Sequence, residues 1–214
     1  MSDLSLQQLK ALRFWQTPEI TSLNRLPAHS QLHSYRSLAD AIAGGASASR
    51  RSLDGDWQFE WFPSPNDVPN DWLNSEATAD CIRVPGNWQL QEYDKPVYTN
   101  VKYPFPATPP IVPEDNPTGC YRRCFWLDES DLVDQTQLVF DGVDSAFFVW
   151  CNGRLVGYSQ DSRLPAEFDI SRSVRAAEND LAVMVLRLCD GSYLEDQDMW
   201  NLSGIYRSVY LLSK

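Results

Sequence analysis

The chain has 214 residues, 43% of them hydrophobic and 12% aromatic, which is enough to build a substantial core in one large or two small domains. Its formal net charge of −11 and its pI of about 4.5 argue against a nucleic-acid-binding protein, which needs a basic surface. The N-terminal sequence MSDLSLQQLKALRF has no continuous apolar run, and no window approaches the ~18 apolar residues of a membrane span, so we expect neither a signal peptide nor a membrane anchor.

Residues 1–50 differ from the rest of the chain. Four leucines near the start could form a short helical face, although they fit a 3.6-residue period poorly: Leu4, Leu6, Leu9 and Leu12. No period holds after them, and AIAGGASASRR (41–51) is typical of a flexible connection. We therefore interpret 1–50 as an irregular arm, which frays or docks elsewhere because it has no core of its own. We expect it to be extended or poorly ordered unless it packs on another subunit.

From residue 51 onward the pattern changes to short strands. In SLDGDWQFEWF (52–62) Trp57, Phe59 and Trp61 alternate with polar residues, which predicts a strand with one buried face. Two β-rich runs, 146–151 and 154–158, flank Asn152-Gly153, a dipeptide that suits a tight type I′ hairpin because both turn positions need positive φ. DLAVMVLRL (180–188) and YRSVYLL (206–212) predict two more strands. Helical patterning is nearly absent after residue 40, so we predict an all-β antiparallel sandwich or jelly roll.

Two segments between the strands have the composition of functional loops. The first, at 103–119, holds six prolines between 104 and 117, so it cannot be a central strand, and long rigid loops are often functional. The second is SYLEDQDMWNLSG (192–204), in which Glu195, Asp196 and Asp198 place three carboxylates within four residues. From the residues alone, a solvated turn is favoured over a cation or polar-ligand site, and a catalytic carboxylate pair is the least favoured.

Other kinds of chemistry find little support. His29 and His33 are the only histidines and both lie in the arm, no G-x-S-x-G or phosphate-binding loop is present, and a Ser-His-Asp triad is therefore not expected. The five cysteines are scattered without a second zinc-ligand pair, which favours reduced, mostly buried thiols and a cytoplasmic protein.

A series of segments in this order resembles the N-terminal part of the glycoside hydrolase family 2 β-galactosidases, the large bacterial lactose-hydrolysing type. The similarity covers nearly the whole chain and includes LNRLPAHS (23–30), RSLDGDWQFEWFPSP (51–65), VPGNWQ (84–89), YDKPVYTNVKYPF (93–105), VPEDNPTGCY (112–121), the long run at 140–171, and LAVMVLRLCDGSYLEDQDMWNLSGIYRSVYL (181–211).

The resemblance implies a jelly-roll, galactose-binding-like sugar-binding domain at 51–214, preceded by the arm at 1–50. It also implies a cytoplasmic homotetramer that hydrolyses terminal non-reducing β-D-galactose residues, as in lactose, with retention. The two catalytic glutamates of the family lie on a later TIM barrel, so we expect these 214 residues alone to be inactive and to depend on the remaining domains. The rival interpretations are another family 2 enzyme such as a β-glucuronidase, a freestanding carbohydrate-binding module, and a purely structural sandwich.

The resemblance also implies site residues. Asn100 would contact sugar hydroxyls, and Asp198 would lie beside the substrate and a sodium ion. From the sequence alone, a strand-end amide bonded to its own backbone is the favoured interpretation of Asn100. Gln160 and Asp190 match two ligands of a family magnesium ion, but the arm ligands fall at Phe14 and Thr17, which puts that ion in doubt.

The neighbours of Asp198 should have supporting roles. We expect Glu195 and Asp196 to cap turns, form ion pairs or face solvent, and Tyr193 and Trp200 to be mostly packed.

Overall fold

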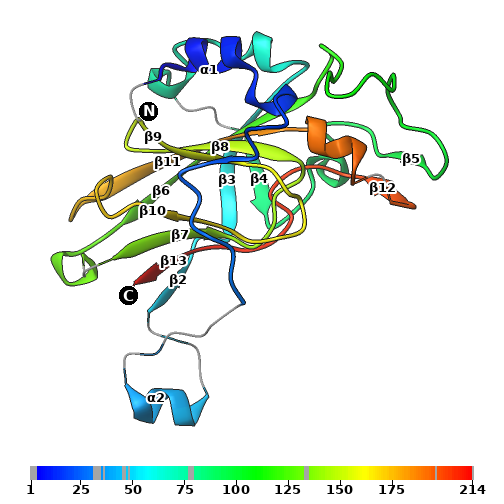
Figure 1. Cartoon of the computed structure of the whole chain (residues 1–214). Coiled ribbons are helices and arrows are strands. Elements are labelled where there is room, and N and C mark those ends of the chain that lie inside the picture. Colours follow the sequence, from blue (N-terminus) through cyan, green and yellow to red (C-terminus); the bar gives the residue numbers. More distant parts are fainter. Residues whose placement is uncertain are drawn as a thin grey trace.

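The computed structural model describes residues 4–30, 35, 37–44, 47, 49–76, 80–132, 135–195 and 197–213. Within these ranges the strands pair antiparallel into three sheets (Figure 1). The largest has seven strands in the order β1 (Ser22–Leu23), β9 (Arg154–Ser159), β8 (Ala146–Cys151), β11 (Glu178–Leu186), β6 (Thr118–Trp126), β3 (Gly55–Phe62) and β4 (Cys81–Val84). The second has the order β10 (Ala166–Asp169), β7 (Thr136–Phe140), β13 (Val209–Ser213) and β2 (Arg50–Ser52). The predicted all-β antiparallel sandwich is confirmed.

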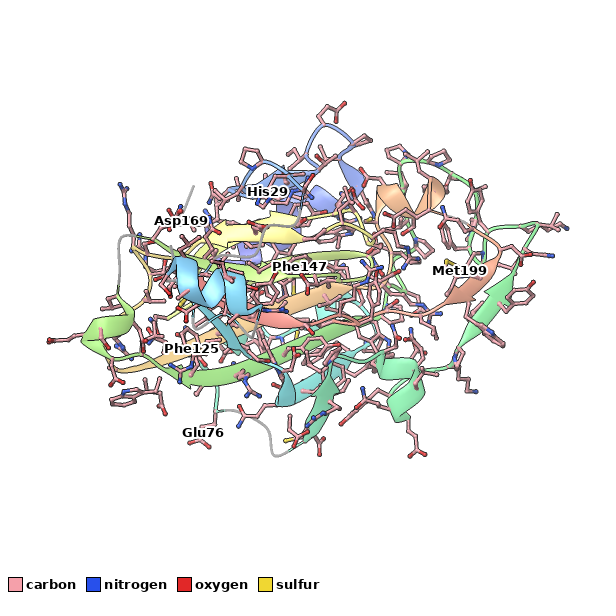
Figure 2. All side chains as sticks on the ribbon, turned by 90° about the horizontal axis from the view of Figure 1, so that it is seen from below. His29, Glu76, Phe125, Phe147, Asp169 and Met199 are labelled. Carbon is pink, nitrogen blue, oxygen red and sulfur yellow. The ribbon has the colours of Figure 1, made fainter. Side chains whose placement is uncertain are left out.

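The remaining elements are short. A two-stranded sheet of β12 (Met199–Asn201) and β5 (Val97–Thr99) projects from one end of the molecule, where Figure 2 labels Met199. The α-helices of the described residues are α1 (Leu6–Leu12) and α2 (Leu38–Ala43), and the 3₁₀ turns span Phe14–Gln16, Pro65–Asp67, Trp72–Asn74, Trp88–Gln91, Glu129–Asp131 and Asp190–Tyr193. None of the helices in the described part of the chain is long and apolar enough to cross a membrane.

The central strands β8 and β11 are buried on both faces. Phe147 and Val149 point into the core between the two large sheets, and Phe147 lies near the middle of the molecule in Figure 2. Phe148 and Trp150 point to the opposite face, where they join a second apolar cluster. Because successive side chains of a strand alternate, the continuous apolar runs AFFVWC and LAVMVL require a cover on each side of the sheet. The structure provides both covers.

The predicted hairpin joins β8 to β9. Asn152 has φ of 51° and Gly153 has φ of 74°, the left-handed values that a type I′ turn requires at both central positions. The Asn152 side chain also donates to the Ser173 carbonyl (2.7 Å) and to Asn179 Oδ1 (2.8 Å), which ties the turn to the following loops. The hairpin prediction is therefore confirmed in both position and turn type.

The structure of the N-terminal arm differs from the predicted one. Residues 4–23 pack on the seven-stranded sheet of their own chain, and Figure 1 shows α1 lying across it. The buried members of this cover are Leu6, Leu9, Phe14 and Trp15. Residues farther along extend the sheet, since β1 pairs with β9, and then bridge to the second sheet, since Leu26 N–H donates to the Glu167 carbonyl (2.8 Å). The expectation that the arm orders only on another subunit is wrong for these residues. The predictions for residues 1–3, 31–34, 36, 45, 46 and 48 of the arm concern positions outside the described residues.

Candidate functional site

The two-stranded sheet brings two distant segments of the chain together. In its register Tyr98 lies opposite Trp200 and Thr99 lies opposite Met199. Asn100 follows β5 directly and Asp198 precedes β12 directly, so the two residues implicated by the sequence sit at the same end of this sheet. Both are exposed. The pairing thus joins the YTNV segment to the acidic cluster, which are about a hundred positions apart in the chain.

Asp198 is held by a residue that the sequence did not suggest. The Tyr98 hydroxyl donates to Asp198 Oδ1 at 2.6 Å, and this hydrogen bond raises the pKa of the tyrosine above its usual value. Within the described residues Tyr98 is the one hydrogen-bond donor to this carboxylate, which leaves Oδ2 open to a further ligand. The Asn100 side-chain amide makes no hydrogen bond to any described residue. It therefore does not cap its own turn, and its donor and acceptor atoms can bind a ligand. The sugar and sodium roles of these residues stay predictions.

The other acids of the cluster differ from Asp198. Both oxygens of Glu195 accept from Ser162, the backbone N–H at 2.9 Å and the hydroxyl at 2.5 Å. Asp196 lies outside the described residues. Tyr193 is buried as expected, and its hydroxyl donates to the Ile111 carbonyl at 2.6 Å. Trp200 is 58% exposed, so the expectation that it is packed is wrong. Among the aromatic rings of the described residues it meets that of Tyr98 alone, tilted by 48° with the centroids 5.5 Å apart, because β12 lies outside the sandwich.

The proline-rich loop is attached to the base of the acidic cluster. The Tyr103 hydroxyl donates to the Tyr193 carbonyl at 2.8 Å, and the rings of Tyr103 and Phe105 both meet the Tyr193 ring edge-on. The Thr108 N–H donates to the Tyr193 hydroxyl at 3.2 Å. Residues 103–117 of this segment form no strand, as the prolines predicted, and one buried tyrosine, Tyr193, fixes them beside the candidate site.

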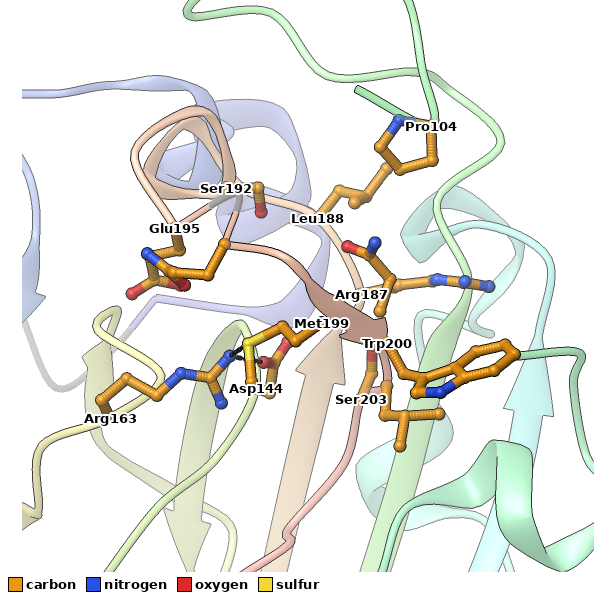
Figure 3. Close-up of a pocket in the computed structure, with 13 residues that line it drawn as sticks. Pro104, Asp144, Arg163, Arg187, Leu188, Ser192, Glu195, Met199, Trp200 and Ser203 are labelled. Carbon is orange, nitrogen blue, oxygen red and sulfur yellow. Dashed lines mark hydrogen bonds and ion pairs between the residues drawn. The ribbon is translucent and has the colours of Figure 1, made fainter. Parts of the chain in front are cut away.

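A small pocket of about 40 Å³ lies behind the acidic cluster, and Figure 3 shows its charged lining. Arg163 Nη2 lies 3.4 Å from Asp144 Oδ2. Burial raises the pKa of the Asp144 carboxyl to about 7, although the positive charge of Arg163 opposes the rise. Arg187 lines the same pocket and pairs with Asp94 at 2.6 Å. Asp144, Arg187 and Asp94 are mostly buried, Arg163 is partly exposed, and the pocket is also lined by Gln197 and Met199 on either side of Asp198.

The residues at the family magnesium position do not form a complete set of ligands. The Phe14 ring packs in the apolar cluster, with its centroid 6.0 Å from Phe148, and it has no atom that could bind a metal. The Thr17 hydroxyl donates to the Arg13 carbonyl at 3.2 Å. Gln160 Nε2 donates to the Tyr158 hydroxyl at 2.8 Å, and Asp190 Oδ2 is buried with no hydrogen-bond partner among the described residues.

In the described part of the chain, no three His, Cys, Asp or Glu side chains are placed to share an ion. We therefore assign no step to magnesium.

We expect magnesium to leave the stability of this chain unchanged. An ion bound at a concentration one hundred times its Kd would add about 2.7 kcal/mol to the free energy of unfolding, which corresponds to several degrees in Tm. Because Phe14 occupies a ligand position, thermal unfolding in millimolar Mg²⁺ and in EDTA should give the same Tm. A magnesium-dependent rise in Tm that disappears in Asp190→Asn would contradict this expectation.

The comparisons with known proteins agree with this fold. A family model described as "Glycosyl hydrolases family 2, sugar binding domain" matches residues 50–214. The chain is 58% identical over 214 residues to the β-galactosidase of Erwinia tasmaniensis, with 99% of this chain and 21% of that protein covered. It is 56% identical over 213 residues to β-galactosidase 2 of Enterobacter cloacae, again with 99% and 21% covered. It thus spans about a fifth of the length of these relatives.

Solved structures of β-glucuronidases share the fold at low identity. The β-glucuronidase from an uncultured Clostridium has a TM-score of 0.61 at 20% identity, covering 79% of this chain and 30% of that one. That of Bifidobacterium dentium, in complex with coumarin-3-O-glucuronide, has a TM-score of 0.55 at 20% identity, covering 78% and 30%. At this identity the likeness concerns the fold alone, whereas three relatives at 54–58% identity are β-galactosidases. The family resemblance of the sequence is confirmed: the chain belongs to glycosyl hydrolase family 2, and residues 50–214 match its sugar-binding domain.

Proposed function

We propose that this chain is the N-terminal part of a β-galactosidase that hydrolyses terminal β-D-galactosides, and that it forms one wall of the galactose pocket. The observation that carries the proposal is the pairing of β5 with β12, which places Asn100 and Asp198 at one exposed end of the same small sheet. An amide donates and accepts hydrogen bonds, and a carboxylate accepts them, so together they suit the hydroxyls of a sugar. The identity of 58% to a β-galactosidase supports galactose over glucuronate.

In this proposal the chain helps to bind the galactoside, and the later domains of the parent polypeptide carry out the hydrolysis. A retaining glycosidase uses two carboxyl groups about 5–5.5 Å apart across the scissile bond. Asp198 is hydrogen-bonded to Tyr98 and Glu195 to Ser162, so these acids do not form such a pair. Sodium prefers oxygen ligands, and Asp198 Oδ2 would supply one of them, with neutral oxygens from other domains completing the shell. The ion would bring positive charge next to the sugar hydroxyls.

Two further features support an intracellular oligomer as part of the proposal. Cys120, Cys124, Cys151 and Cys189 are free thiols and three of them are buried, as suits the reducing cytoplasm. Helix α2 stands away from the sandwich in Figure 1, and it exposes Leu38 and Ile42 at 78% each, one turn apart. Such a small apolar face suits contact with another copy of the chain, as in a homotetramer.

The test uses the parent polypeptide that continues past residue 214. Asp198→Asn keeps the size of the side chain and removes its charge, so we expect kcat/KM for a chromogenic β-galactoside to fall by about 10²-fold or more. The response to sodium should weaken at the same time, because the ion loses its charged ligand.

Two variants serve as controls. Asp56→Asn removes an exposed carboxylate that pairs with Arg83 at 3.3 Å far from the site, and it should leave kcat/KM unchanged. Asp196→Asn, within the cluster, should have a much smaller effect than Asp198→Asn. If Asp198→Asn and Asp196→Asn were equally harmless, the cluster would be a solvated turn. Cleavage of a β-glucuronide in preference to the galactoside would favour the rival enzyme.

A further inference from the structure

The loop that carries Asp198 has little support from its own residues. Leu194 is 87% exposed, and Gln197, Asp198 and Met199 are exposed as well. A segment with so few buried apolar contacts would move freely unless something else fixed it, and a binding residue needs to be held to within about 0.5 Å of its working position. The hydrogen bond between Tyr98 and Asp198 cannot supply this support by itself, because it joins the loop only to the small sheet of β5 and β12, which also projects into solvent.

Glu195 attaches the loop to the body of the protein. Its two carboxylate oxygens accept from the N–H and the hydroxyl of the same residue, Ser162, at 2.9 and 2.5 Å. Ser162 is completely buried, and its carbonyl accepts from the Tyr206 hydroxyl at 2.5 Å. Hydrogen bonds to a charged acceptor are about twice as strong as neutral ones, and two from one rigid donor also fix the direction of the carboxylate.

The turn that presents Ser162 is itself fixed. Asp161 has φ of 84°, and its Oδ1 accepts from the N–H groups of Arg163 (3.2 Å) and Leu164 (3.3 Å). From the same turn, the Arg163 guanidinium reaches Met199 Sδ at 3.3 Å, as Figure 3 shows. The turn at 161–164 therefore holds the acidic loop at Glu195 and at Met199, on both sides of Asp198.

We infer that Glu195 is a positioning residue, whose bond to Ser162 sets the place of Asp198 in the galactose pocket. The inference rests on the proposed function, and it assigns opposite roles to two carboxylates of one cluster. Glu195 has both oxygens engaged inside the protein, whereas Asp198 has one oxygen on Tyr98 and faces solvent.

Two substitutions of Glu195 distinguish the loss of the hydrogen bonds that position the loop from the loss of the negative charge. Glu195→Ala removes both acceptors, and in the parent polypeptide it should raise KM and the half-saturating sodium concentration by about 10- to 100-fold, as expected when a binding group is displaced by about 1 Å. Glu195→Gln keeps an acceptor for the Ser162 N–H. Its amide can donate to the Ser162 oxygen if the hydroxyl turns its proton away from residue 195 and towards the nearby Asp144 carboxyl. This variant should stay within roughly threefold of the wild type, because only the charge is lost.

A second measurement does not depend on activity. Amide hydrogen exchange in 194–199 should become at least about tenfold faster in Glu195→Ala and in Ser162→Ala, and should change little in Glu195→Gln. Asp169→Ala is the matched control, because Asp169 Oδ1 likewise accepts from the N–H (2.9 Å) and hydroxyl (2.6 Å) of one serine, Ser171, away from the site. It should alter neither the exchange of 194–199 nor KM.

Equal losses in Glu195→Gln and Glu195→Ala would overturn the inference, because they would mean that the charge itself is needed at the substrate. Unchanged exchange in Glu195→Ala would overturn it as well. If Asp198→Asn proved harmless, the proposed function would fail, and the exchange of 194–199 would still decide whether Glu195 holds the loop.

Discussion

Gly157→Ala should detach the N-terminal arm from the sheet and lower the free energy of unfolding by about 1–3 kcal/mol. Gly157 lies in β9, next to the strand β1 of the arm, and opposite Val149 of β8. A Cβ at this position would collide with the Leu23 backbone carbonyl oxygen and lie 2.5 Å from Cε1 of Phe168. Phe168 belongs to the core between the sheets, so the backbone of the arm would have to move if the core did not.

The result can be read from urea unfolding together with amide exchange in 20–26. Gly153→Ala is the matched control in the same hairpin: its φ of 74° is unfavourable for alanine, but an added Cβ meets no atom within 4 Å. It should lower stability without accelerating exchange in the arm. Slow exchange of 20–26 in Gly157→Ala would show that the sheet absorbs the extra methyl group without releasing β1.

Asp144→Asn should remove part of the pH dependence of stability. Burial raises the pKa of Asp144 to about 7 in the folded protein, against about 3.9 in an unfolded chain. The folded state therefore binds more protons between these values, and its stability falls as the pH rises from about 4 to about 7. The full shift corresponds to about 4 kcal/mol. The charges that face the carboxyl are Arg163, Arg187 and Glu195, and none of them is removed by the substitution.

The measurement is the difference in unfolding free energy between variant and wild type across this range. That difference should move in favour of Asp144→Asn as the pH rises. Asp169→Asn provides a control of opposite sign: burial acts to raise the pKa of Asp169, but its bonds from Ser171 hold it below the usual value. Asp169 therefore adds stability that is lost on acidification. Parallel curves for Asp144→Asn and the wild type would show that Asp144 titrates normally in the folded state.

The sequence predicted the elements whose signals are local. The alternating aromatics of β3, beginning at Trp57, and the Asn152-Gly153 turn carry their structure within a few residues, so both were predicted correctly. The docking of the arm was not predicted, because Leu6 and Leu9 lie on a seven-residue helix and Trp15 on a following 3₁₀ turn, and no single period links them. Their partner surface is the outer face of β8 and β11, which sequence spacing does not reveal.

At the candidate site, too, the contacts between distant segments could not be predicted from the sequence. Asn100 and Asp198 came from the family resemblance, and the spacing of the residues alone favoured a solvated turn. The bond from Tyr98 to Asp198 depends on the register of β5 with β12, and the bond from Ser162 to Glu195 depends on how two loops meet. Trp200 was misplaced because an aromatic residue beside a strand usually packs, while here β12 leaves the sandwich.

Because β8 and β11 are buried on both faces, the domain that the family model matches and the segment that folds as one unit have different boundaries. The family model starts at residue 50, yet residues 4–30 supply much of the cover over Phe148, Trp150 and Met184. A polypeptide cut at that boundary would present an aromatic sheet face to water, together with the unpaired edge of β9. Such a surface favours self-association, so the shortest polypeptide that stays monodisperse should include the arm, although the family domain does not.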